Sequence, residues 1–118
     1  MAYTSFEDLE VWKRACRLSV DLYRIIDNCK DYSFRDQMRR AAISIASNIA
    51  EGAERHSKKE YAHFLHIAKG SAGELRTQLY IANKIGIIKS KDRQQLCLEL
   101  IEISKMLHGL IKGISQQP

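Results

Sequence analysis

Residues 37–52, QMRRAAISIASNIAEG, decide the fold of this chain. Apolar residues recur here every three or four positions, as on one face of an α-helix. They cover about half of the helix surface or more, which exceeds the ~100° stripe of an ordinary surface helix. They are Met38, Ala42, Ile43, Ile45, Ala46, Ile49 and Ala50. Because many residues of the stretch are small, neighbouring backbones can approach closely. We predict that it is the inner helix of an all-helical bundle.

The rest of the chain fits the same all-α class. Of its 118 residues, 45% are hydrophobic and 28% are charged, as in a soluble globular domain. The single proline is Pro118, and no alternation of β-branched residues indicates a strand. Short turns separate four predicted helices, which favours an antiparallel up-down four-helix bundle over residues 1–118. The helices are expected at about residues 6–29, 33–54, 57–85 and 90–114.

The predicted helix ends rest on capping residues. Each helix is expected to begin at a serine, with an acidic residue within the next three positions. The serines are Ser5, Ser33, Ser57 and Ser90. Gly86 is placed to end the third helix, because glycine readily adopts the left-handed conformation of a C-cap.

The first helix carries two apolar seams, which is more than one bundle face needs. One seam consists of Leu9, Trp12, Cys16, Tyr23 and Ile26. The other consists of Val11, Ala15, Leu18, Leu22, Ile25 and Cys29. A deeply buried helix explains this pattern, and so does an outer seam that contacts another subunit.

Positive charge is concentrated on the third helix. Residues 57–89 contain six basic and two acidic residues and so hold +4 of the net charge of +5. The candidate nucleic-acid-binding residues on one side of this helix are Lys59, His66, Lys69, Arg76 and Lys84. Cations along a rod can follow a phosphate backbone, which predicts binding to RNA or DNA. The alternative is a solvated surface on a protein–protein adaptor bundle.

Several polar residues and glycines of the second and third helices are assigned structural or interface roles. They are Arg40, Ser44, Asn48, Glu51, Gly52, Gly70, Gly73 and Glu74. A buried ion pair that fixes helix register is the expected use of the charged residues among them. The two mid-helix glycines, Gly70 and Gly73, each cost about 1 kcal/mol relative to alanine, which close helix packing or a nearby ligand would offset.

Other function classes lack the residues that they need. Glu60 and His63 have the Glu-x-x-His spacing of di-iron bundles, but the second pair and the two further glutamates are missing. No nucleophile–base pair, glycine-rich phosphate loop or two-carboxylate cleft is recognisable, so we expect no catalysis, metal or cofactor. Three cysteines without a CxxC motif indicate idle thiols in a reducing compartment.

The sequence also predicts a cytoplasmic protein without a membrane partner. No apolar run approaches the ~20 residues that span a bilayer. The first ten residues, MAYTSFEDLE, are polar and acidic, unlike a signal peptide.

Three blocks of the chain resemble a known family. They are FEDLEVWKRACRL at the start of the first helix, QMRRAAISIASNIAEGAER in the second and FLHIAKGSAGELRTQLYIA in the third. The family consists of four-helix bundles and includes the proteins encoded within 23S rRNA intervening sequences. The accessory variability proteins of diversity-generating retroelements are relatives.

The resemblance implies an up-down bundle that assembles into a ring-like homopentamer. In the retroelement branch it also implies a basic nucleic-acid-binding surface and a reverse transcriptase as protein partner. Most members have no assigned activity. The family blocks map onto Arg40, Ser44, Asn48, Glu51 and Gly52, and onto Gly70, Ser71, Glu74 and Leu75. These positions imply structural or interface roles.

Overall fold

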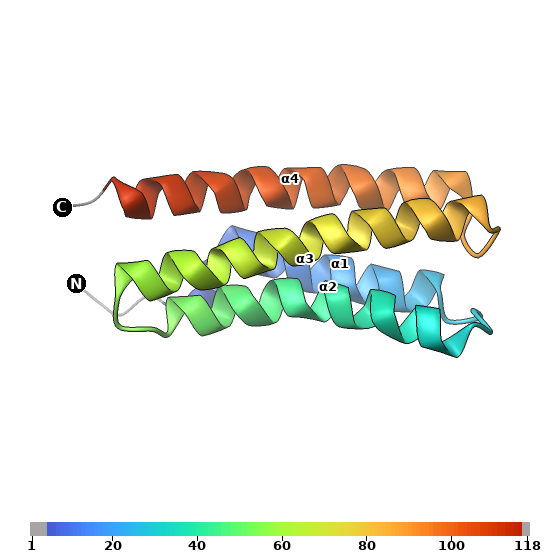
Figure 1. Cartoon of the computed structure of the whole chain (residues 1–118), viewed down its shortest axis with the longest axis horizontal. Coiled ribbons are helices and arrows are strands. Elements are labelled where there is room, and N and C mark those ends of the chain that lie inside the picture. The colour runs from blue at the N-terminus through green and yellow to red at the C-terminus, as the bar shows by residue number, and fades with distance from the viewer. Residues whose placement is uncertain (1–4, 117–118) are drawn as a thin grey trace.

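The computed structural model describes residues 5–116, which form a short 3-10 turn and four long helices (Figure 1). The elements are η1 (Phe6–Asp8), α1 (Glu10–Ile25), α2 (Tyr32–Ala53), α3 (Lys58–Lys84) and α4 (Ser90–Ser115). Consecutive helices run in opposite directions within a rod of 49 × 21 × 20 Å, so the predicted all-α up-down bundle is confirmed. Residues 1–4 of the polar N-terminal stretch and Pro118 lie outside the described residues.

The hydrophobic core runs the length of the rod and receives side chains from all four helices. On α3 the apolar seam Leu65, Ala68, Ala72, Leu75, Leu79 and Ala82 is buried, and Tyr61 at its start is half-buried. On α4 the buried seam is Leu96, Leu100, Ile103, Leu107, Ile111 and Ile114, whereas Leu110 is half-buried. Among residues 5–116 no polar or charged residue is fully buried, so apolar packing alone fills the centre.

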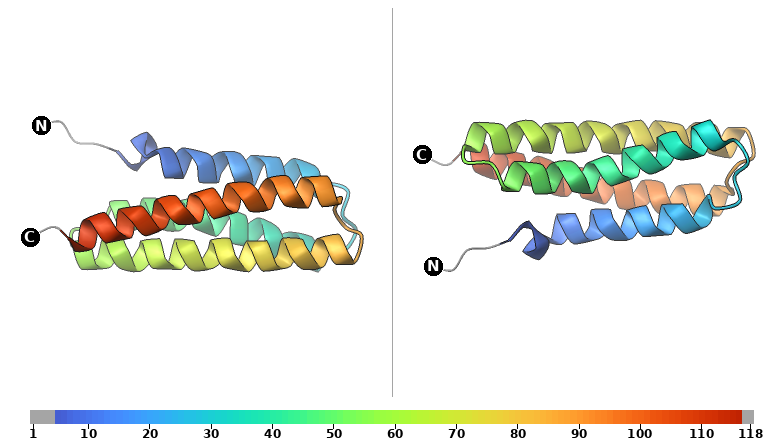
Figure 2. Two further views of the ribbon diagram at one scale, coloured as in Figure 1. Left: turned by 90° about the horizontal axis from the view of Figure 1, so that it is seen from above. Right: turned by 90° about the horizontal axis from the view of Figure 1, so that it is seen from below.

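The helix α1 is shorter than predicted, because the chain leaves the helical conformation at both ends. The hydroxyl of Ser5 accepts a hydrogen bond from the Glu7 amide at 3.1 Å and caps only the 3-10 turn. Leu9 is then extended, and α1 begins at Glu10 rather than near Phe6. At the other end the helix stops at Ile25, and residues 26–31 form the turn. Figure 2 shows α1 diverging from α4 toward the beginning of α1.

Three of the four predicted serine caps are wrong for the long helices, because Ser5 caps only the 3-10 turn and Ser33 and Ser90 cap no helix. The carboxylate of Asp31, not Ser33, caps α2 by accepting a hydrogen bond from the Phe34 amide at 3.1 Å. Helix α4 has no side-chain cap, since the hydroxyl of Ser90 instead accepts a bond from Asn83 Nδ2 at 3.2 Å. Only Ser57 caps its long helix as predicted.

The turn between α3 and α4 depends on Gly86, as predicted. Its φ of 84° is left-handed, a conformation that costs little without a Cβ. The amides of Gly86 and Ile87 donate back to the carbonyls of Asn83 and Ala82 at 3.2 and 2.8 Å. This pair of bonds is the Schellman motif, and it brings α4 back alongside α3.

The two seams of α1 have different environments. The seam of Val11, Ala15, Leu18 and Leu22 faces the core. The other seam is less protected, since Trp12 and Cys16 are half-buried and Tyr23 is exposed. A deeply buried α1 is therefore ruled out within this chain: Ile26 of the second seam joins the core, whereas Trp12, Cys16 and Tyr23 remain partly or fully exposed.

Candidate nucleic-acid interface

A basic groove lies between α3 and α4. Lys69 and Arg76 come from α3, two turns apart, so both point to the same side of that helix. Lys105 and His108 come from α4. Ile101 and Ser104 complete the lining of a cavity of about 320 Å³. The groove therefore holds three cationic side chains and one imidazole without an acidic residue in its lining.

The side chains of Lys69 on α3 and His108 on α4 contact each other across the basic groove. Lys69 Nζ lies 3.4 Å from His108 Nδ1. A lysine ammonium has only donors, so the ring nitrogen of His108 is the acceptor side of this contact. An incoming phosphate oxygen would be a stronger acceptor for the same ammonium, because charge-assisted hydrogen bonds are about twice as strong as neutral ones. The contact thus holds Lys69 at the groove without neutralising its charge.

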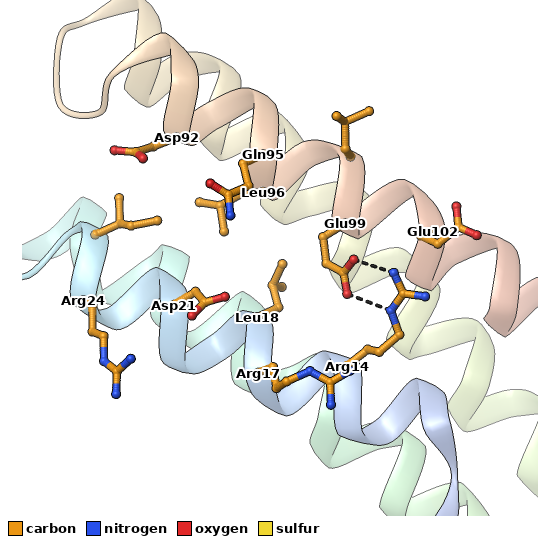
Figure 3. A pocket seen from close by; sticks show the side chains of 12 residues that line it. Arg14, Arg17, Leu18, Asp21, Arg24, Asp92, Gln95, Leu96, Glu99 and Glu102 are labelled. Atoms are coloured by element: carbon orange, nitrogen blue, oxygen red, sulfur yellow. Dashed lines mark hydrogen bonds and ion pairs between the residues drawn. The ribbon is translucent and has the colours of Figure 1, made fainter.

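The groove on the other side of α4 has a different character. It lies between α1 and α4, has a volume of about 800 Å³ and is shown in Figure 3. All three acidic residues of α4, Asp92, Glu99 and Glu102, line it. Arg14 of α1 crosses the groove to Glu99, with Nε and Nη2 donating to the two carboxylate oxygens at 2.8 and 2.5 Å.

The Arg14–Glu99 pair stabilises the charged form of both side chains. Its bidentate hydrogen bonds lower the pKa of the Glu99 carboxyl and raise the pKa of the Arg14 guanidinium. Both side chains are about two-thirds to three-quarters buried, with exposed fractions of 26% and 32%. The mixed-charge groove is therefore internally compensated, whereas the basic groove is not.

The remaining predicted binding residues lie apart from the basic groove. Lys59 is in the first turn of α3 and Lys84 is its last residue, so the two are about 37 Å apart at 1.5 Å per residue. His66 is exposed about one turn before Lys69. Lys84 Nζ lies 5.5 Å from the centroid of the exposed Tyr80 ring. Of the five predicted residues, Lys69 and Arg76 line the basic groove, and the sequence reasoning missed Lys105 and His108.

The predicted structural residues on α2 form a hydrogen-bonded seam with α3. The hydroxyls of Ser44 and Ser71 are 3.0 Å apart across the two helices. Asn48 Nδ2 donates to the carbonyl and hydroxyl oxygens of Ser44 at 2.8 and 2.9 Å. This polar contact fixes the relative position of α2 and α3 without an ion pair.

The predicted buried ion pair does not occur among residues 5–116. Glu51 pairs with Arg55 one turn further along α2, on the exposed surface. Arg40 and Glu74 are both exposed and line a cavity of about 370 Å³ with no ion pair between them. The expectation is wrong because serine and asparagine side chains, rather than charged ones, occupy the contact between α2 and α3.

Close helix packing occurs at Gly52, not at the two glycines of α3. A Cβ at Gly52 would lie 2.9 Å from Phe64 Cβ and 3.1 Å from the Tyr61 carbonyl oxygen. A Cβ at Gly70 or Gly73 would meet nothing within 4 Å. The prediction that Gly70 and Gly73 allow close packing is therefore wrong within this chain, and both leave the outer side of α3 open.

An apolar groove lies between α1 and α2. Its volume is about 380 Å³, and it is lined by Trp12 and Cys16 of the second α1 seam and by the outer edge of the central helix α2. The lining residues are Phe6, Trp12, Cys16, Ser19, Ile43, Ala46, Ser47 and Ala50. Burial raises the pKa of the Cys16 thiol, which disfavours the reactive thiolate.

Two absences among the described residues bear on the candidate site. Residues 5–116 contain no group of three or more histidine, cysteine, aspartate or glutamate side chains placed to hold a metal ion. None of the described helices is long and apolar enough to cross a membrane.

The fold and this pattern of residues define a four-helix-bundle protein. The family model of the 23S rRNA-intervening sequence proteins matches residues 7–109, and the chain belongs to that family. No curated protein matches it. A crystal structure of a protein of unknown function from the S23 ribosomal protein family of Bacteroides thetaiotaomicron VPI-5482 is similar, with a TM-score of 0.81 and 24% identity. That match covers 86% of this chain and 98% of the other. At this identity the likeness supports the fold, and neither match indicates an enzymatic family.

Proposed function

We propose that this protein is a non-enzymatic, oligomeric, cytoplasmic bundle that binds RNA or DNA through the basic groove between α3 and α4. The observation that carries the proposal is the convergence of Lys69 and Arg76 of α3 with Lys105 and His108 of α4 on one cavity. No acidic residue lines this cavity, so its charge is available to a polyanion. Phosphate contacts of this kind are independent of sequence.

The segregation of charge on α4 supports the same proposal. The acidic residues of α4 all turn toward α1, where Arg14 compensates Glu99. Lys105 and His108 turn toward α3, where Lys69 and Arg76 add to them. A surface that served only solubility would gain nothing from such a separation, because dispersed charges keep a protein in solution equally well.

A salt titration tests the proposal. Binding of a labelled oligonucleotide is measured by fluorescence anisotropy from about 50 to 200 mM salt, a range over which phosphate contacts lose affinity steeply. Three phosphate contacts per subunit predict a slope of about −2 for single strands or −3 for duplex in a plot of log affinity against log salt. Absence of binding at the lowest salt would reject a nucleic-acid role and leave the protein–protein adaptor as the function.

The oligomeric part of the proposal rests on the apolar groove between α1 and α2. Ile43 is 44% exposed beside the half-buried Trp12, on the helix whose apolar face is wider than one core contact needs. A second copy of the chain would cover this surface, in agreement with the homopentamer that the family resemblance implies. Light scattering gives the mass in solution, and a monomer at micromolar concentration would contradict this part. In that case a partner protein such as a reverse transcriptase would be the remaining candidate to cover the apolar groove between α1 and α2.

A further inference from the structure

We propose that the basic groove takes single-stranded rather than duplex nucleic acid, with an unpaired base in the groove and a second base on the ring of Tyr80. This inference rests on the proposed function and narrows its ligand to one class. It depends on three features: the width of the face, the apolar floor of the groove and the exposed aromatic ring beyond it.

The face formed by α3 and α4 is too wide to enter a duplex groove. One helix with its side chains is about 10–12 Å across, so two helices side by side present about 20 Å. The major groove of B-DNA is about 12 Å wide and admits a single helix. A duplex on this face would reach the rim cations Lys69, Arg76 and Lys105 through its phosphates, but no base edge would be accessible.

The floor of the groove is suited to a base. Ile101 is half-buried between the cationic side chains, and the cavity of about 320 Å³ is at the lower end of the range that holds small organic ligands. In a duplex the apolar faces of the bases are stacked inside and cannot reach such a floor. In a single strand they are free to pack on it.

Tyr80 provides a second surface on which a base can stack, further along α3 from the floor of the basic groove. It lies one turn beyond Arg76 on the same side of the helix, and the residue is 55% exposed. Lys84 Nζ lies 5.5 Å from the ring centroid, so a cation accompanies the ring. A positively charged track beside an exposed aromatic ring is the usual arrangement in proteins that bind single strands without sequence preference.

The chain offers a matched control for Tyr80. Tyr32, at the start of α2, is also exposed and has a cation over its ring, with Arg35 Cζ at 4.9 Å from the centroid. It lies on a helix that does not border the basic groove. Tyr80→Ala and Tyr32→Ala therefore remove the same kind of exposed cation–ring contact, but only Tyr80→Ala removes the ring proposed to stack a base beside the basic groove.

The experiment compares single strands with blunt duplexes of the same mixed sequence, in RNA and in DNA form, by fluorescence anisotropy on the full chain at low salt. For both RNA and DNA, we expect the single strand to bind about tenfold more tightly than the duplex. Tyr80→Ala should weaken single-strand binding by about tenfold, the usual cost of one lost stacking contact, and leave duplex binding unchanged. Tyr80→Phe and Tyr32→Ala should each bind single strands like the wild type.

The outcomes separate this inference from the proposed function. Equal binding of duplex and single strand, or an equal loss of both in Tyr80→Ala, would overturn the single-strand assignment and leave the salt-dependent function standing. Loss in Tyr32→Ala as large as in Tyr80→Ala would also overturn it. If the wild type binds neither form, the proposed function and this inference both fail.

Discussion

The grooves on the two sides of α4 differ in how their charges are compensated. Toward α1, Arg14 spans the groove and forms two hydrogen bonds with Glu99. Toward α3, Lys69, Arg76 and Lys105 line a groove without an acidic partner in its lining. Helix α4 carries bases and acids in nearly equal number, yet its acidic residues all face one side. The comparison shows that the direction in which charges point, rather than their sum over a helix, decides which side of α4 carries uncompensated positive charge.

Charge reversal in the basic groove should have the largest effect. Lys69→Glu, Arg76→Glu and Lys105→Glu together remove three phosphate contacts and introduce repulsion. We expect nucleic-acid affinity at low salt to fall by about 100-fold or more, about 2.7 kcal/mol. Anisotropy measures the affinity, and light scattering checks that the oligomer is unchanged.

Charge reversal in the groove between α1 and α4 is the control for this prediction. Arg17→Glu and Arg24→Glu change charges that line the groove between α1 and α4. They should lower nucleic-acid affinity by less than the triple reversal in the basic groove does, because they act only through long-range repulsion, which salt screens. If the two sets weaken binding equally, net charge rather than the basic groove determines binding.

Two glycine substitutions test whether the outer side of α3 is as open as the comparison requires. Gly52→Ala places a Cβ against Phe64 and the backbone of Tyr61, and we expect a loss of about 1–3 kcal/mol of unfolding free energy. Gly73→Ala, between Lys69 and Arg76 in the sequence, meets open space and should raise the unfolding free energy by up to about 1 kcal/mol. Thermal or urea unfolding measures both. A destabilised Gly73→Ala would mean that a neighbouring subunit covers the basic surface.

Removal of the compensating pair should have the smallest effect, and the effect should depend on pH. Glu99→Gln breaks the charge-assisted bonds to Arg14 and should cost about 1 kcal/mol of unfolding free energy at pH 7. The folded-state pKa of Glu99 is lowered, so its contribution is complete above the unfolded-state pKa of about 4.3 and is lost as pH falls toward the lower folded value.

Unfolding of wild type and Glu99→Gln at pH 7 and at about pH 3 measures this dependence. The difference between the two proteins should shrink at the lower pH. Nucleic-acid binding near neutral pH should be unaffected, because Glu99 belongs to the other groove. A constant difference across the pH range would show that Glu99 contributes through packing alone.

Much of the fold could be predicted from single residues and their spacing. The 3.6-residue period placed α2, α3 and α4, because an apolar stripe can be buried in only one way in a bundle. Ser57 and Gly86 identified helix ends, since each provides a bond or conformation that the end itself requires. The ends of α1 were missed because the apolar pattern continues through Leu9 and Ile26, whereas Leu9 is extended and the chain turns at residues 26–31.

The candidate site could be predicted only in part. Lys69 and Arg76 were found because positive charge on α3 is visible in the sequence. Lys105 and His108 were missed because α4 is nearly neutral when its charges are summed. The one signal that could have found them is the helical phase of α4, in which Glu99 and Glu102 lie on a different side from His108.

The sequence by itself determined that this protein is a four-helix bundle of the 23S rRNA-intervening sequence family, with its positive charge on α3. Periodicity and capping are local properties, so they are readable without a structure. Only the tertiary structure decided that α3 and α4 share a basic groove, that Gly52 is the point of close contact and that Arg14 compensates Glu99. Each of these depends on side chains that are distant in the chain and are brought together by the antiparallel packing of the helices.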